Sequence, residues 1–139
     1  ELPHRASSLA PVRDRLLQGL QDRIPDMFLN GHATRRLPHN VNVSFLYVEG
    51  ESMLLFLNME GIYVSSGSAC TSRSLKSSHV LSCIGTDAAA ANGTLLMTIG
   101  TGTTQDDVTY VLEKLPPIVQ RLREMSPLYE DMIKNRTKA

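Results

Sequence analysis

The sequence contains no tryptophan, only two cysteines, and acidic and basic residues in equal number, 14 of each. Cys70 and Cys83 are too few for a disulfide framework, so we expect free thiols in a reducing compartment. The lack of a CxxC motif or a Cys/His cluster argues against a metal site such as zinc. A zero charge balance argues against nucleic acid as a main partner, since that usually requires a basic surplus. Small-molecule substrates and protein partners are compatible with these absences.

Long hydrophobic runs are also missing. No apolar run approaches the roughly 20 residues needed to span a bilayer, and no signal peptide is visible. We therefore expect no membrane partner and a cytoplasmic location, or an organelle matrix if the source is eukaryotic. The 139 residues, 42% of them hydrophobic, fit a single domain over 1–139 with a buried core. Because the chain begins with Glu1 and opens into helix-like sequence, a processed or excised piece of a longer protein is one interpretation, and a separately encoded domain is the other.

Apolar residues at helical spacing predict a first helix that begins at Ser8 as its N-cap and ends at Pro25. A short apolar helix is expected over 52–59. A long amphipathic helix follows Thr104 and Asp107, which together make a capping-box-like start. The prolines at 116 and 117 should kink that helix.

Alternating apolar and polar residues predict a strand over 41–47, with shorter strands over 28–29, 62–64 and 95–99. The order of elements predicts an α+β fold, in which helices pack on one face of a small sheet of three to four strands. A helix is also expected over 78–84. Within it, Cys83 should pack in the core as a small hydrophobe.

Residues 66–77 contain almost no large apolar side chain, so we predict a mobile loop there. Cys70 lies in it, and a thiolate in such a setting is a nucleophile. Gly67 and the serines beside it supply backbone freedom, and His79 is a possible base. An idle loop cysteine is the competing interpretation, and composition alone leaves both open. The polar tail over 126–139 is expected to fray or to dock on a partner.

The segment Val64-Ser-Ser-Gly-Ser-Ala-Cys-Thr-Ser72 resembles the active-site loop of cysteine desulfurases of the NifS/IscS type, which are class-V aminotransferase-like enzymes. Residues 40–52, 78–85 and 121–129 agree with the same family in order and spacing. The resemblance covers nearly the whole chain, but only the C-terminal part of such an enzyme. It implies the mostly antiparallel C-terminal domain of fold-type I pyridoxal phosphate enzymes, with the large pyridoxal phosphate domain absent.

Enzymes of this family take sulfur from L-cysteine with pyridoxal phosphate and release L-alanine. The resemblance implies that Cys70 is the persulfide-forming nucleophile, which passes sulfur to an iron–sulfur scaffold or another acceptor protein. The residues implied as support in the same loop are Ser66, Gly67, Ser68, Ala69, Thr71 and Ser72.

Two departures from the family pattern bear on activity. The cofactor lysine belongs to the absent domain, which a separate chain would have to supply, and the four lysines here lie on loop, surface helix or tail. The family arginine that clamps the substrate carboxylate corresponds to Leu96, and a second arginine to Thr101. We therefore expect this chain alone to bind no pyridoxal phosphate and to be inactive. The alternative is a non-catalytic sulfur carrier or binding relative that lost substrate binding.

Overall fold

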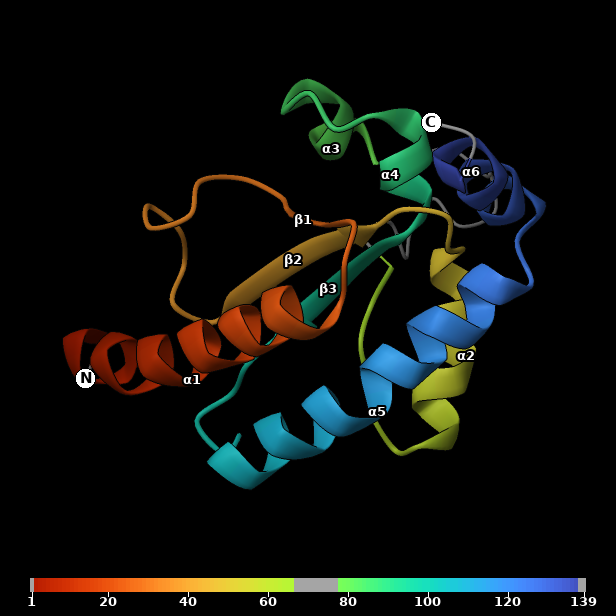
Figure 1. The fold of residues 1–139 in the computed structure, drawn as a ribbon. Helices are drawn as coiled ribbons and strands as arrows, with labels where there is room; N and C mark the ends of the chain where they lie inside the picture. The colour runs from red at the N-terminus through yellow and green to blue at the C-terminus, as the bar shows by residue number, and fades with distance from the viewer. Residues whose placement is uncertain (1, 67–77, 138–139) are drawn as a thin grey trace.

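The computed structural model describes residues 2–66 and 78–137. It confirms the α+β class, with a three-stranded antiparallel sheet in the order β1-β2-β3 (Figure 1). The strands are β1 (Met27–Leu29), β2 (Asn40–Phe45) and β3 (Thr94–Thr98). The helices in the described part of the chain are α1 (Leu2–Arg23), α2 (Gly50–Met59), α3 (His79–Cys83), α4 (Ala88–Asn92), α5 (Gln105–Glu124) and α6 (Pro127–Thr137).

The sheet has one apolar and one polar face, because successive side chains of a strand point to opposite sides. In the central strand β2, Val43 pairs with Leu29 of β1 and with Leu95 of β3, and all three lie on the apolar face. That face joins the hydrophobic core. The residues between them, such as Asn42 and Ser44, lie on the polar face. The alternation in the sequence therefore predicted strand β2 and its buried face correctly.

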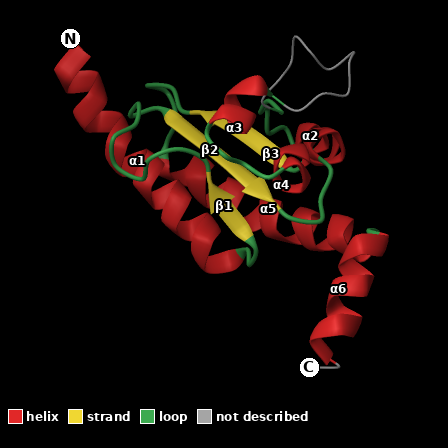
Figure 2. Cartoon of the chain, turned by 90° about the horizontal axis from the view of Figure 1, so that it is seen from above, coloured by secondary structure: helices red, strands yellow, loops and turns green. Residues whose placement is uncertain are grey.

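Helices α1 and α5 pack against each other over the apolar face, as the two perpendicular views show (Figures 1 and 2). Gly19 of α1 meets the side chain of Leu112 of α5 at a distance that leaves no room for a Cβ atom. A larger residue at this position would require the Leu112 side chain to shift within the contact between the two helices. The capping box of α5 is present, with Thr104 and Asp107 hydrogen-bonded reciprocally, and the helix continues through both of its prolines.

Four local expectations differ from the structure. Helix α1 begins at Leu2 and includes Ser8, whose hydroxyl donates to the Arg5 carbonyl one turn back instead of capping the helix. The predicted strand at 62–64 forms no ladder, and only Ser65 makes an isolated bridge. Cys83 is exposed, because the short helix α3 turns Leu81 inward instead. The tail expected after residue 126 forms helix α6.

Arg123, near the end of α5, is a charged residue whose side chain is almost completely buried. Its guanidinium donates to the carbonyls of Leu46 at 3.1 Å, Pro25 at 2.7 Å and Asp26 at 3.3 Å. Asp26 and Tyr47 have positive φ angles of 53° and 65°. Arg123 therefore joins two backbone turns in the left-handed region, which non-glycine residues enter only at a cost.

An Arg123→Met substitution should destabilise the fold by about 3 kcal/mol, because it leaves buried carbonyls without donors. In thermal unfolding followed by circular dichroism, this corresponds to a fall in Tm of about 10 °C for a chain of this size. Arg121→Met is the matched control, since Arg121 is exposed and only stacks on Phe56. Removing this stacking should lower the free energy of unfolding by less than about 1 kcal/mol. Equal losses in the two variants would show that the buried contacts do not stabilise the turns.

Candidate functional site

The backbone before residue 67 is attached to the edge of the sheet. The Ser65 amide donates to the Leu96 carbonyl at 3.1 Å, and the Leu96 amide donates to the Ser65 carbonyl at 2.7 Å. This bridge adds a single residue pair beside β3, on the side opposite β2. Cys70 lies five residues further along the sequence. The segment that leads to the candidate nucleophile is thus bonded to Leu96, the position at which the family resemblance predicts an arginine.

Gly50, the first residue of α2, lies in tight contact with the same edge. A Cβ atom at this position would be 2.9 Å from the Asn92 carbonyl oxygen, 3.2 Å from that of Thr94 and 3.6 Å from the Cβ of Ser66. Only glycine fits so close an approach without displacing backbone. The start of α2 therefore packs against both the beginning of β3 and the segment that precedes Cys70.

A ladder of hydrogen bonds crosses the polar face of the sheet. The side-chain nitrogen Nδ2 of Asn30 donates to Asn42 Oδ1 and to Ser44 Oγ, both at 2.8 Å, and Ser44 Oγ lies 2.7 Å from Thr94 Oγ1. Asn42 also pairs with Leu96 across the two strands. The ladder satisfies the buried polar groups and lies beside Leu96, so it makes this face rigid and polar.

The sequence did not predict this ladder, although the alternation in β2 contributes two of its side chains. Asn40, Asn42 and Ser44 recur at every second position of β2, which places all three on one face. A polar second face is common on an antiparallel strand whose other face joins the core, because that face is usually solvated. The alternation therefore predicted the two faces of β2, and only the tertiary structure showed that Ser44 is buried in a ladder.

The described chain resumes at Ser78, just before α3, and this part is also linked to the ladder. The Thr86 hydroxyl, in the connection from α3 to α4, donates to Asn30 Oδ1 at 3.3 Å. His79 is exposed at the first position of α3. Both described flanks of residues 67–77 are therefore attached to β3 or to the ladder on the polar face.

Several of the predicted site residues lie outside the described residues, namely Gly67, Ser68, Ala69, Cys70, Thr71 and Ser72. Their roles, and that of His79 as a base, stay predictions. Ser66 and Leu96 are described and lie near each other through the Ser65 bridge. Thr101 is exposed in the turn after β3, where the Gly100 amide donates to Thr103 Oγ1 at 3.1 Å. This turn leads into the capping box that the sequence predicted at Thr104 and Asp107.

Among residues 2–66 and 78–137, no three His, Cys, Asp or Glu side chains lie close enough to hold a metal ion. No helix in this part of the chain is long and apolar enough to cross a membrane.

Comparisons with known proteins agree with this geometry. Residues 5–111 match the protein family described as Aminotransferase class-V. The chain is 49% identical over 137 residues to a cysteine desulfurase IscS of Clostridium botulinum, a match that covers 97% of this chain and 34% of the relative. It is 52% identical over 128 residues to a cysteine desulfurase IscS of Methanosarcina thermophila, covering 92% of this chain and 31% of the relative. The chain thus spans about a third of the length of the curated relatives it matches.

A solved structure described as a NifS-like protein has the same fold. It superposes with a TM-score of 0.72 at 27% identity, over 86% of this chain and 29% of that protein. A NifS-like protein from Rickettsia africae also reaches a TM-score of 0.72, at 19% identity over 84% of this chain, and so supports the fold alone.

Enzymes of the matched family depend on pyridoxal phosphate, and the described lysines do not fit that cofactor. A lysine that forms a Schiff base must lose its proton, so its pKa has to be lowered. The pKa of Lys114 is instead raised by its hydrogen bond and charge interaction with Glu60, whose carboxylate lies 2.8 Å from Nζ. Lys134 is exposed and paired with Glu130 at 3.6 Å. No step through pyridoxal phosphate follows from these residues.

Proposed function

The chain belongs to the class-V aminotransferase family, and on that basis we propose that it is the sulfur-accepting C-terminal part of a cysteine desulfurase. The observation that carries the proposal is its identity of about one half, over nearly its whole length, to relatives named cysteine desulfurase. Those names favour a desulfurase domain over a non-catalytic carrier.

Cys70 is the proposed nucleophile. In the overall reaction of a complete enzyme, L-cysteine and the Cys70 thiol give L-alanine and a Cys70 persulfide, so atoms and electrons balance. The sulfur then passes to an acceptor thiol when that thiolate attacks the outer sulfur and the Cys70 thiolate leaves. Iron–sulfur scaffold proteins are the proposed acceptors. The remaining two thirds of the enzyme would supply pyridoxal phosphate and its lysine.

The polar face of the sheet supports this assignment. The Ser65 bridge to Leu96 precedes Cys70, and the Thr86 bond to Asn30 follows it. A nucleophile whose flanking segments are both tied to a rigid sheet returns to one place after each transfer, which limits the entropy lost in positioning it. Ser66 and the five other candidate residues of the loop would let the thiol reach both donor and acceptor.

This chain alone should release neither alanine nor sulfide when it is incubated with L-cysteine and pyridoxal phosphate. The described lysines do not fit the cofactor, and Leu96 offers no guanidinium to the substrate carboxylate. Alanine and sulfide are measured over time, with a full-length cysteine desulfurase as the positive control. Turnover by the chain at a rate comparable to that control would contradict the proposal that the cofactor and its lysine come from the remaining part of the enzyme.

The proposal itself is tested with a donor that already carries persulfide sulfur. The chain is incubated with a low-molecular-weight persulfide, and mass spectrometry of the intact protein and of its peptides locates any added sulfur. We expect one sulfur atom on Cys70, because its thiolate can attack the outer sulfur of the donor and release the donor thiol. Absence of sulfur on Cys70, or its accumulation on Cys83 instead, would refute the proposed function.

A further inference from the structure

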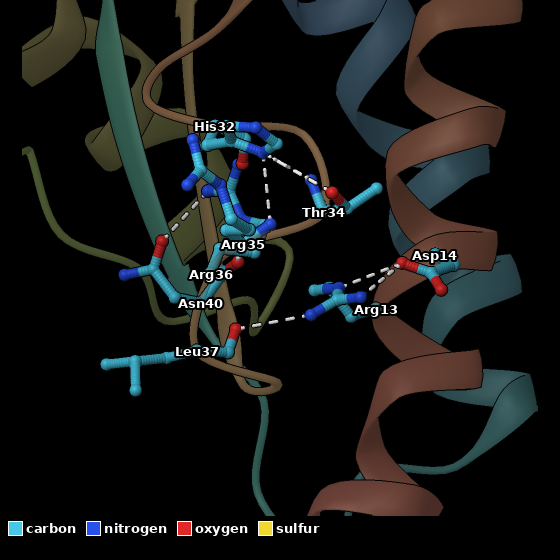
Figure 3. A network of polar contacts seen from close by, with 8 residues as sticks. All are labelled: Arg13, Asp14, His32, Thr34, Arg35, Arg36, Leu37 and Asn40. Atoms are coloured by element: carbon cyan, nitrogen blue, oxygen red, sulfur yellow. Dashed lines mark hydrogen bonds and ion pairs between the residues drawn. The ribbon is translucent and has the colours of Figure 1, made fainter.

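The connection between β1 and β2 folds against α1 and brings two arginines of the loop to the side of the helix that carries an Arg–Asp pair. Arg35 and Arg36 come from the connection, while Arg13 and Asp14 come from the helix (Figure 3). The residues of this network thus carry three positive charges and one negative charge, in a chain whose total charge is zero. None of these residues has a part in the proposed sulfur chemistry.

Asp14 is paired with Arg13 through one of its two carboxylate oxygens. Its Oδ1 atom accepts from Arg13 Nε at 2.8 Å and lies 2.7 Å from Arg13 Nη2. The third nitrogen, Nη1, donates to the Leu37 carbonyl at 3.4 Å. The Arg13 side chain is only 9% exposed. The one carboxylate of the cluster therefore neutralises the arginine that is buried between helix and loop.

The Arg36 guanidinium is held in place by neutral oxygens only. Nε donates to the Asn40 carbonyl at 3.1 Å, Nη2 to Asn40 Oδ1 at 3.0 Å, and Nη1 to the His32 carbonyl at 3.3 Å. Burial, and then the charge of Arg13, lowers the pKa of Arg36. Within the described part of the chain no carboxylate pairs with it. A guanidinium has five N–H groups, so two remain available on a rigid, positively charged fork.

The outer surface of the loop offers further donors and one apolar side chain. Arg35 is exposed, and its guanidinium has no partner among the described residues. His32 Nδ1 accepts the backbone amides of Thr34 and Arg35 at 3.1 and 3.0 Å, so the ring proton lies on Nε2. Leu37 is 62% exposed. The surface thus combines several donors with a hydrophobic contact, and its exposed side chains provide few acceptors.

We propose that this loop, residues 32–37, is a docking site for a Glu- or Asp-rich segment of a protein partner. Carboxylates match the geometry of Arg donors and supply the missing negative charge. Leu37 would pack against an apolar side chain within that segment, a contact that a phosphate backbone does not offer. The zero net charge of the chain also disfavours a nucleic acid here, because backbone binding requires a basic surplus.

The test measures binding of the complete chain to a fluorescent synthetic peptide that is rich in glutamate and contains a central leucine. The anisotropy of the peptide is followed as protein is added, first at low and then at high salt. A peptide with every glutamate changed to glutamine is the ligand control. We expect saturable binding of the glutamate peptide that weakens with salt, and no binding of the glutamine peptide.

The protein variant is Arg35→Glu, which alters an exposed side chain and leaves the bonds of Arg13 and Arg36 in place. It should weaken binding about tenfold or more, since it places like charges together. Arg121→Glu, on α5, has the same change in net charge and should bind as the unaltered chain does. Equal weakening by both variants, equal binding of the two peptides, or no binding at low salt would overturn the proposal. Tighter binding of a single-stranded oligonucleotide than of the glutamate peptide would also overturn it.

Discussion

A Cys70→Ser variant is expected to take up no sulfur from a persulfide donor. Transfer requires a nucleophile that attacks the outer sulfur and then holds it as a persulfide. A serine hydroxyl remains protonated at neutral pH and forms no stable bond of this kind, whereas a cysteine is partly ionised. The loss should be complete, and it is measured by mass spectrometry of the intact protein after incubation with the donor.

Cys83→Ser is the matched control for this experiment, since the chain has only these two thiols. Cys83 is exposed on α3, so serine should replace it without leaving a cavity. This variant should load one sulfur atom as the unaltered chain does. If Cys83→Ser lost sulfur uptake and Cys70→Ser retained it, the exposed thiol of α3 would be the acceptor, and the assignment based on the loop motif would be wrong.

Gly93→Ala should prevent stable folding, although it adds only one methyl group. A Cβ atom at this position would overlap the Phe45 carbonyl oxygen and lie 2.8 Å from that of Val48. Both obstacles are backbone atoms, and the Phe45 amide donates to the Gly93 carbonyl at 2.9 Å, so neither side can move without breaking the start of the β2–β3 pair. We expect a loss of about 4 kcal/mol or more in the free energy of unfolding, at the extreme of single substitutions.

Urea unfolding followed by circular dichroism measures this loss, and Gly102→Ala is the matched control. Gly102 has open space around its Cα and no positive φ, so alanine fits there. Its effect should stay within about 0.5 kcal/mol, as for other exposed sites. A Gly93→Ala protein as stable as the control would mean that β2 and the start of β3 are not so closely packed.

The fold could be predicted from the sequence where a pattern was local and repeated. The alternation in β2 and the spacing of Leu16 and Leu20 in α1 placed these elements on the core, because both periods follow directly from backbone geometry. The predictions failed where a tertiary contact decided the outcome. Ile62 to Val64 has the composition of a strand, yet the chain reaches the edge of β3 only at Ser65. The apolar neighbours of Cys83 indicated burial, but a helix as short as α3 buries Leu81 alone.

For the candidate site too, some features could be recognised from the sequence and others only from the tertiary structure. The motif around Cys70 and the departure at Leu96 are properties of the sequence, since a thiol and the lack of a guanidinium need no coordinates to be recognised. Only the tertiary structure showed that Leu96 pairs with Ser65, and that Asn30 links the polar face to the α3–α4 connection. These partners are 31 residues apart for the bridge and 56 for the Asn30–Thr86 bond. Contacts over such separations depend on how the helices pack on the sheet, which no local pattern encodes.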